Sequence, residues 1–321
     1  MLLVLTNSKD VTADYLLARL TDESVSFVRF DTDHALSHVE LNYRPGRPQL
    51  NIDGVEFAPS DFSSVWYRRP EKLISPTPGA PTPETQCALD EWSEGLEAFF
   101  AHIPRSRWMN HPAANAKASR KLEQLTTAQK IGFTIPDTLV TQNAGQLRDF
   151  FRVHNGEIIV KPMGRAYVER PLEENDTLIY TNQVPASELD DLADLSVCPT
   201  LFQQGIRKKS DVRITVIDSH VYAFELNAYD ETGRQRCDIR RNNMADVIYR
   251  AIKLPVSVDT AVRKLVSYYE LRFAAIDMAV ADDGTWYFFE VNPNGQWAWL
   301  DLCGVSEIYR SFIRSFADAT C

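Results

Sequence analysis

The segment that decides the fold is FAAIDMAVADDGTWYFFEVN, residues 273–292. Two apolar runs flank Asp-Asp-Gly-Thr, and this pattern predicts a β-hairpin. With Asp283 and Gly284 as the two turn residues, one side of the hairpin is continuously apolar. The facing pairs expected on that side are Val280–Tyr287, Met278–Phe289 and Ile276–Val291.

The opposite side of the predicted hairpin is acidic. Asp277 faces Glu290, and Asn292 lies two residues further along the same face. Side chains that face each other in an antiparallel pair have Cβ atoms about 4.5–5.5 Å apart, and like charges there repel. Two carboxylates and an amide oxygen suit Mg²⁺ that bridges substrate phosphates. The alternatives are a solvated face, or one carboxyl held protonated; a different turn would separate Asp277 from Glu290 but leave Glu290 and Asn292 on one face.

Outward from this hairpin, the N-terminal region begins with a strand, a helix and a strand at 2–5, 11–20 and 25–30. The turn Thr6-Asn7-Ser8-Lys9-Asp10 contains no glycine, so a dinucleotide-binding reading fails and a small α/β domain remains. Proline-rich residues 70–83 predict an extended loop. The other elements expected here are a hairpin at about 39–57, strands at 64–70 and 107–110, and a helix at 84–102.

The rest of the chain alternates between helical and strand patterns. One helix is expected over 114–131, with Gly132 as its C-terminal stop. A long hairpin over 163–182 and an acidic helix over 186–195 follow the strand 157–160. The remaining expectations are strands at 201–203, 212–217 and 221–226 and a helix at about 257–270.

Several basic side chains accompany the acidic hairpin. Lys161 ends an apolar strand before Pro162, and Lys121 lies in the helix 114–131. Either lysine alone reads as a surface residue, but a triphosphate needs both a metal and lysine charge. Asp211 and Arg213 alternate on one strand and point the same way. Asp238, Arg240 and Arg241 form a second cluster, and spacing alone does not separate phosphate or carboxylate binding from ordinary surface pairing.

Composition narrows the class of protein. The chain of 321 residues is 44% hydrophobic and 24% charged, which is typical of a globular enzyme. Its formal charge of -10 disfavours nucleic acid and acidic membranes as partners. Five scattered cysteines indicate reduced thiols rather than a disulfide frame or zinc site. No signal peptide or membrane helix is recognisable, so we expect a cytoplasmic protein.

The order of motifs from about Asn110 to Trp299 resembles that of the ATP-grasp ligases. These motifs are IGFTIPDTLV after Lys121, then IVKPM, LFQQGIRKKSDVRITV, DIRR, AAIDMAV and FFEVNPNGQW. Within that superfamily, WYRRP, the Asp211–Arg213 pair and EVNPNGQW resemble the microviridin-type, or graspetide, peptide macrocyclases, which are related to the ribosomal-protein glutamate ligases. The order and spacing of the motifs together are specific, whereas each motif alone is modest.

The resemblance implies an α/β fold of the ATP-grasp type (α+β), with an N-terminal α/β domain before two domains that sandwich ATP. The expected boundaries are 1–115, 116–204 for the central lid, and 205–321 for the C-terminal domain. Relatives commonly have glutamate where Gln204 stands; because this hinge recognises adenine partly through its backbone, ATP remains the expected nucleotide. The roles implied are Lys121 and Lys161 on the phosphates; Gln203, Gln204, Gly205 and Ile206 against adenine; Asp211 on the ribose; Asp277, Glu290 and Asn292 on Mg²⁺; Arg240 or Arg241 on the transferring phosphoryl group; and Arg213 on the substrate carboxylate.

The implied reaction activates an Asp or Glu side chain of a ribosomal precursor peptide as an acyl phosphate. A hydroxyl or amine of the same peptide then closes an ω-ester or ω-amide ring. The precursor's leader is expected on the lid hairpin at about 164–182 and the helix 186–195, whose acidic residues otherwise read as a solvated face. Relatives also suggest a homodimer. The competing hypotheses are an intermolecular ligase on the same fold and a non-catalytic nucleotide-sensing or peptide-binding module.

Overall fold

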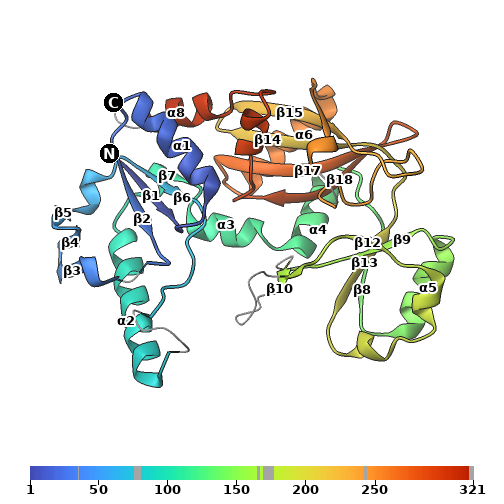
Figure 1. Cartoon of the computed structure of the whole chain (residues 1–321), viewed down its shortest axis with the longest axis horizontal. Helices are drawn as coiled ribbons and strands as arrows, with labels where there is room; N and C mark the ends of the chain where they lie inside the picture. The colour runs from blue at the N-terminus through green and yellow to red at the C-terminus, as the bar shows by residue number, and fades with distance from the viewer. Residues whose placement is uncertain (35, 76–80, 165–166, 169–176, 242–243, 318–321) are drawn as a thin grey trace.

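The N-terminal region of the computed structural model is built on a parallel sheet in the order β2-β1-β6-β7. Its strands are β1 (Leu2–Thr6), β2 (Phe27–Asp31), β6 (Ser64–Tyr67) and β7 (Trp108–Met109). The helices α1 (Val11–Asp22) and α2 (Pro83–Phe100) accompany this sheet (Figure 1). The hairpin expected near 39–57 gains a third strand, in the order β3 (Val39–Arg44), β4 (Arg47–Ile52), β5 (Val55–Phe57).

The structure describes residues 1–34, 36–75, 81–164, 167–168, 177–241 and 244–317. Within these residues, no helix has both the length and the apolar character needed to cross a membrane.

The expected helix over 114–131 is wrong in one respect, because two helices occupy this stretch. These are α3 (Pro112–Ala118) and α4 (Lys121–Ile131). The buried Gln124 side chain donates to the Ala118 carbonyl at 2.5 Å and so satisfies the end of α3. The break leaves Lys121 in the first turn of α4. Gly132 ends α4 with φ of 111°, as the sequence predicts.

The central region contains an antiparallel sheet in the order β12-β9-β13-β8. Its members are β8 (Thr138–Thr141), β9 (Ile158–Lys161), β12 (Asn182–Gln183) and β13 (Thr200–Gln204), and α5 (Ala144–Val153) packs beside it. The short strands β10 (Tyr167–Val168) and β11 (Thr177–Leu178) pair within the hairpin predicted for 163–182. Residues 165–166 and 169–176 of that predicted hairpin lie outside the described residues.

The acidic helix predicted for 186–195 is also wrong. Two 3₁₀ turns, Ala186–Leu189 and Ala193–Ser196, replace it. Asp191 accepts a hydrogen bond from the Ala193 amide at 3.1 Å. Such a local side-chain bond competes with helical hydrogen bonding and explains the interruption.

The C-terminal region is an antiparallel sheet in the order β16-β15-β14-β17-β18. Its strands are β14 (Lys208–Ile217), β15 (His220–Asn227), β16 (Ile248–Ala251), β17 (Phe273–Ala281) and β18 (Trp286–Asn292). The helices α4 and α6 (Val256–Tyr268) bury one face of this sheet. The short helix α7 (Ala298–Leu302) and α8 (Tyr309–Ala317) cover part of the other face, next to the N-terminal region (Figure 1).

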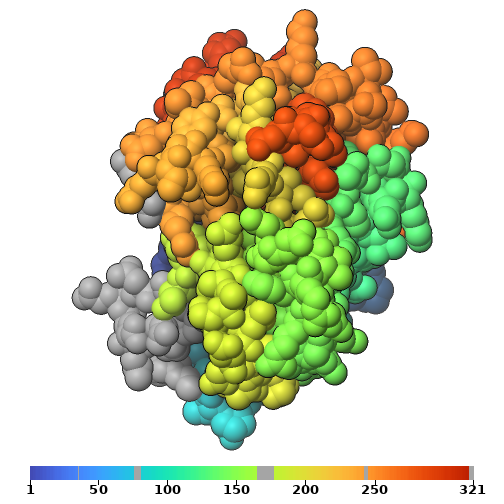
Figure 2. All heavy atoms as spheres, turned by 90° about the vertical axis from the view of Figure 1, so that its right-hand side faces the viewer, coloured from blue at the N-terminus to red at the C-terminus, as the bar shows by residue number. Residues whose placement is uncertain are grey.

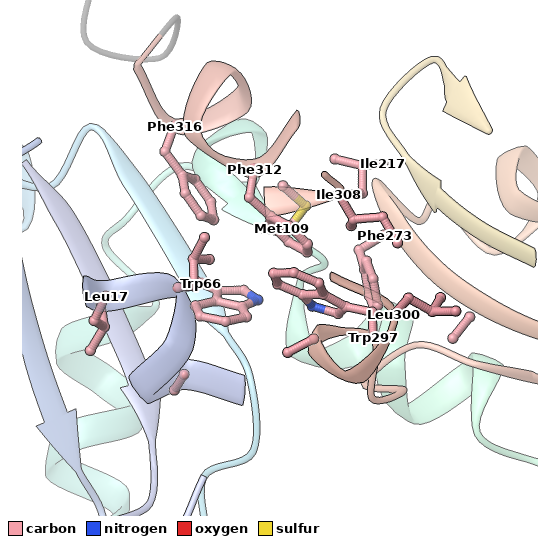
Figure 3. Packing of buried hydrophobic residues seen from close by; sticks show 14 of the residues in the cluster. Leu17, Trp66, Met109, Ile217, Phe273, Trp297, Leu300, Ile308, Phe312 and Phe316 are labelled. Atoms are coloured by element: carbon pink, nitrogen blue, oxygen red, sulfur yellow. The ribbon is translucent and has the colours of Figure 1, made fainter. Parts of the chain in front are cut away.

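A shared core joins the N-terminal and C-terminal regions (Figure 3). Trp66 of β6 packs against Phe312 of α8, and Phe312 stacks on Trp297 with ring centroids 4.7 Å apart. Trp297 is fully buried. The loop that follows β18 is therefore fixed against the N-terminal sheet.

Candidate active site

The predicted acidic pair lies at the centre of the C-terminal sheet. Asp277 of β17 is directly opposite Glu290 of β18, as the sequence predicts. On its other side, Asp277 is opposite Arg213 of β14. Three charged side chains therefore form one row across three neighbouring strands, on the face that α4 and α6 leave uncovered.

The predicted pair Ile276–Val291 is also confirmed, but the register between Asp277 and the turn is wrong by one residue. Ala281 and Thr285 close a three-residue turn, with Gly284 at φ of 86°, instead of the predicted two-residue turn. A register shift between Asp277 and Met278 then restores the expected pairing of Asp277. The observed pairs beyond that shift are Met278–Phe288 and Val280–Trp286, in place of Met278–Phe289 and Val280–Tyr287.

The bulge changes which phenylalanine is buried. Phe288, rather than Phe289, packs in the core beneath the sheet and is fully buried. Phe289 lies 5.9 Å from the Lys161 ammonium, measured to the ring centroid. The bulge therefore adds an aromatic ring to the charged row.

The negative charge of Asp277 is only partly offset by its surroundings. An Arg213 nitrogen lies 3.1 Å from its carboxylate. Burial raises the pKa of Asp277 to about 6, with a further increase from Glu290, although Arg213 acts in the opposite direction. Arg213 alone does not offset the burial of this carboxylate beside a second one.

Glu290 is paired with lysine charge from two directions. The Lys121 ammonium lies 3.2 Å from its carboxylate and donates to the Pro162 carbonyl at 3.0 Å. Burial acts to raise the pKa of Glu290, but Lys121 and Lys161 together hold that pKa below its usual value. Lys121 thus bridges the C-terminal sheet and the loop after β9.

Lys161 is an unusual lysine because it is partly buried at the end of β9. Burial lowers the pKa of its ammonium from 10.5 to about 8, while Glu290 counteracts that effect. Figure 2 shows the central residues as a lobe beneath the C-terminal residues. Lys161 comes from the central region and Glu290 from the C-terminal sheet, so their charges meet between the two.

The three predicted metal ligands share one face. Asn292 lies opposite Ala275, one pair beyond Ile276, and its Oδ1 accepts from the Asn294 amide at 2.9 Å. Across the described ranges, no group of three His, Cys, Asp or Glu side chains has a metal-binding arrangement. Two carboxylates and one amide oxygen fit Mg²⁺, which keeps waters and takes substrate phosphates as further ligands.

Asp211 lies on the same face of β14 as Arg213, as predicted. Its carboxylate accepts from Lys208 at 2.9 Å and from Gln235 at 2.8 Å. Sequence reasoning missed both partners, because Lys208 resembles a surface lysine and Gln235 lies in an irregular segment. These contacts fix the direction of the Asp211 carboxylate.

Arg240 and Arg241 lie near the central region. Asp238 holds the Arg240 guanidinium through bonds of 2.9 and 2.5 Å and also accepts from the Thr181 amide at 3.1 Å. The bond to Asp238 raises the pKa of Arg240, and Glu290 and Asp277 contribute to the increase. Arg241 instead donates to the Asn182 side chain.

The residues predicted for adenine lie at the connection between β13 and β14. The amides of Gln204 and Gly205 donate to the carbonyls of Asp137 and Glu157 at 2.9 and 2.7 Å, respectively. Gln203 is buried and donates to Thr138 at 2.9 Å, and Ile206 follows in the link to β14. Gln204 lines a groove of about 590 Å³ between α4, β8 and β18, together with Leu122, Leu125 and Tyr287.

Comparison with solved structures shows that the chain has the fold of the ATP-grasp ligases. Among ATP-grasp ligases of solved structure, the chain is similar to peptide macrocyclases. The macrocyclase MdnC from Microcystis aeruginosa MRC, bound to the precursor peptide MdnA, has a TM-score of 0.86 at 24% identity, covering 99% of this chain and 100% of MdnC. No protein-family model matches the sequence, and no curated relative aligns with it.

Two further structures have the same arrangement. The Chryseobacterium gregarium RiPP-associated ATP-grasp ligase, in complex with ADP and a leader and core peptide, has a TM-score of 0.80 at 26% identity, covering 99% of this chain and 95% of that ligase. The ligase PsnB, in complex with a minimal precursor, Mg and ADP, has a TM-score of 0.76 at 20% identity, covering 99% and 98%. The predicted ATP-grasp fold and its resemblance to graspetide-type ligases are confirmed.

Proposed function

We propose that the protein is an ATP-dependent, ADP-forming carboxylate ligase that closes ω-ester or ω-amide rings in a ribosomal precursor peptide. The main support for this proposal is the row Arg213–Asp277–Glu290, with Lys121 and Lys161 beside it between the central region and the C-terminal sheet. It combines carboxylates for a metal, lysines for phosphates and an arginine for a carboxylate. The complexes of MdnC and of the Chryseobacterium ligase with their peptides support this substrate class.

In this proposal, ATP and Mg²⁺ use side chains from both regions. Asp277, Glu290 and Asn292 hold Mg²⁺, which offsets charge on the phosphates when it is bound. Lys121 and Lys161 contact those phosphates, so Lys121 exchanges its pairing with Glu290 for the nucleotide. Gln203, Gln204, Gly205 and Ile206 lie against adenine, and Asp211 offers its remaining lone pairs to the ribose.

Arg213 and Arg240 serve the reacting groups. Arg213 orients the substrate carboxylate, whose oxygen attacks the γ-phosphorus while the bond to ADP breaks. Arg240, held by Asp238, contacts the phosphoryl group in transfer, with Arg241 beside it. A peptide hydroxyl or amine then attacks the acyl carbon and loses its proton, and phosphate leaves with the acyl oxygen.

Further parts of the proposal concern the assembly and its surroundings. We assign residues 1–115, 116–204 and 205–321 to N-terminal, lid and C-terminal domains. The leader of the precursor docks on the lid, against residues of about 164–182 and the acidic stretch 186–195. We propose that the enzyme is of the microviridin type. We also propose a homodimer, and a cytoplasmic location where ribosomal peptides and ATP are available.

Incubation with ATP, Mg²⁺ and the precursor encoded beside the gene tests this proposal. The expected product is lighter than the precursor by one water for each link, and one ADP is released for each. A gain in mass after adding a free amine or amino acid would instead identify an intermolecular ligase. Absence of ADP formation with every peptide would support a non-catalytic binding module.

A further inference from the structure

The loop that follows β18, residues 293–296, is held by one buried arginine from the N-terminal sheet. Arg68 is 1% exposed and pairs with the buried Asp10 at 3.2 Å. Its guanidinium donates to the carbonyl of Asn294, to the carbonyl of Gly295 at 3.2 Å and to the Gln296 side chain at 2.7 Å. One side chain thus fixes three successive residues of a loop that begins directly after Asn292.

We call the bonds from Arg68 to residues 294–296 the Arg68 clamp, and other N-terminal side chains add to it. Arg69 donates to the Asn294 carbonyl at 3.2 Å, and Asn110 donates to the Pro293 carbonyl at 3.0 Å. Asn115 donates to the Asn294 side chain at 3.2 Å. All of these donors precede α4 in the chain, so the N-terminal region supplies the bonds that shape the loop.

The loop is also pressed against β17. A Cβ atom added to Gly295 would lie 2.3 Å from the Cβ of Ala275, so only glycine permits this approach. Ala275 is the residue opposite Asn292. The adjacent Trp297 is buried in the core that it shares with Trp66 (Figure 3). The backbone on either side of Asn294 is therefore fixed.

We propose that Arg68 is a positioning residue that sets the place of Asn292 in the metal site, and that the N-terminal region acts as its platform. The inference rests on the proposed function, because it takes Asn292 as a metal ligand. Arg68 acts through the loop, since its guanidinium is committed to Asp10 and to loop acceptors. This role accounts for the motif WYRRP, residues 66–70, which the proposed reaction leaves unused.

Mn²⁺ binding in the presence of ADP, followed by electron paramagnetic resonance, tests the proposal. Arg68→Lys keeps a positive charge beside Asp10 but cannot reach all three acceptors. We expect the dissociation constant for Mn²⁺ to rise about 10–100-fold, as for other residues that orient metal ligands. The matched control is Arg107→Lys, because the Arg107 guanidinium donates to the carbonyls of Ser60 and Phe62, away from the loop 293–296; its Mn²⁺ affinity should match the wild type.

A steric pair gives a second test should Arg68→Lys not fold. Gly295→Ala should weaken Mn²⁺ binding to a similar degree, and adding Ala275→Gly should restore it, because that change removes the opposing Cβ. Hydrogen exchange of the ligand-free protein supplies an independent measure. The Gly295 amide, which donates to the Asn292 carbonyl at 3.3 Å, should exchange faster in Arg68→Lys.

Unchanged Mn²⁺ affinity in folded Arg68→Lys and Gly295→Ala proteins would overturn the positioning role. If the wild type binds Mn²⁺ with ADP and forms cyclised product in that case, the proposed function stands alone. If the wild type binds no Mn²⁺ with ADP, both proposals fail. A purely structural role would lower the stability of Arg68→Lys without changing Mn²⁺ affinity of the folded fraction.

Discussion

Lys161→Met is expected to stabilise the ligand-free protein while removing phosphate binding. The pKa of Lys161 falls from 10.5 to about 8 because the ammonium is buried near the end of β9. At about 1.4 kcal/mol for each pKa unit, carrying the charged form at pH 7 destabilises the folded state by about 3 kcal/mol. Methionine has a similar length and no charge, so the variant avoids this penalty.

The pH dependence isolates this effect from changes in packing. Between about pH 8 and 10.5, unfolded Lys161 keeps a proton that the folded protein has released, so stability of the wild type rises relative to the variant. The advantage of Lys161→Met should therefore be largest at pH 7, up to about 3 kcal/mol, and should vanish near pH 10.5. Urea unfolding of both proteins at several pH values measures the difference.

The matched control is Lys264→Met on the exposed face of α6, for which we expect no pH-dependent difference. ADP should raise the stability of the wild type and of this control, but not that of Lys161→Met. A difference between wild type and Lys161→Met that stays constant from pH 7 to 10.5 would refute the reasoning, because it would show that Lys161 titrates alike in the folded and unfolded states.

Four further substitutions test the site. Glu290→Gln should lower turnover about a hundredfold or more with an unchanged circular dichroism spectrum, because a metal ligand loses its charge; full activity in a cyclisation assay would exclude the metal assignment. Arg213→Ala should impair acyl phosphate formation more than ADP binding measured by calorimetry, and a parallel loss of both would contradict its role. Asp238→Asn should lower turnover about tenfold through Arg240, which loses its charged partner; in an Arg240→Ala background, the same change should have no further effect. Gln124→Leu should destabilise the fold by about 2–4 kcal/mol in urea, because the Val291 amide and carbonyl that it bonds at 3.0 and 2.8 Å become unpaired; unchanged stability would mean that water replaces it.

The acidic pair was predictable because two local deviations compensate. The turn is one residue longer than predicted, which moves Met278 opposite Phe288. The bulge beside Asp277 moves the register back, so Asp277 still faces Glu290. The alternation of apolar and polar residues predicts which face of the hairpin is acidic. It does not reveal the bulge, because the extra residue, Phe289, is as apolar as Phe288.

The helical errors have a different origin. The apolar pattern over 114–131 is continuous across the break, and the cause is a tertiary contact of the Gln124 side chain with Ala118 and β18. In 186–195, hydrogen bonding by Asp191 outweighs a helical pattern of leucines. Neither interaction is visible in residue periodicity.

The Arg68 clamp could not be predicted from the sequence, because its partners are far apart along the chain. Arg68 and its loop acceptors are separated by more than 220 residues. A buried arginine looks identical to a surface arginine in sequence, since its burial depends on Asp10 and on the approach of a loop from another sheet. Gly295 is a local signal in the sequence, because the lack of a Cβ permits the close approach of the loop to Ala275.

The most direct test of the metal assignment is anomalous diffraction from crystals grown with ADP and Mn²⁺. We expect one strong peak bonded to oxygens of Asp277, Glu290 and Asn292, with the Lys121 ammonium moved to a phosphate. A bound nucleotide whose Mn²⁺ lies away from both carboxylates, while Arg213 and Lys121 keep their present partners, would contradict it.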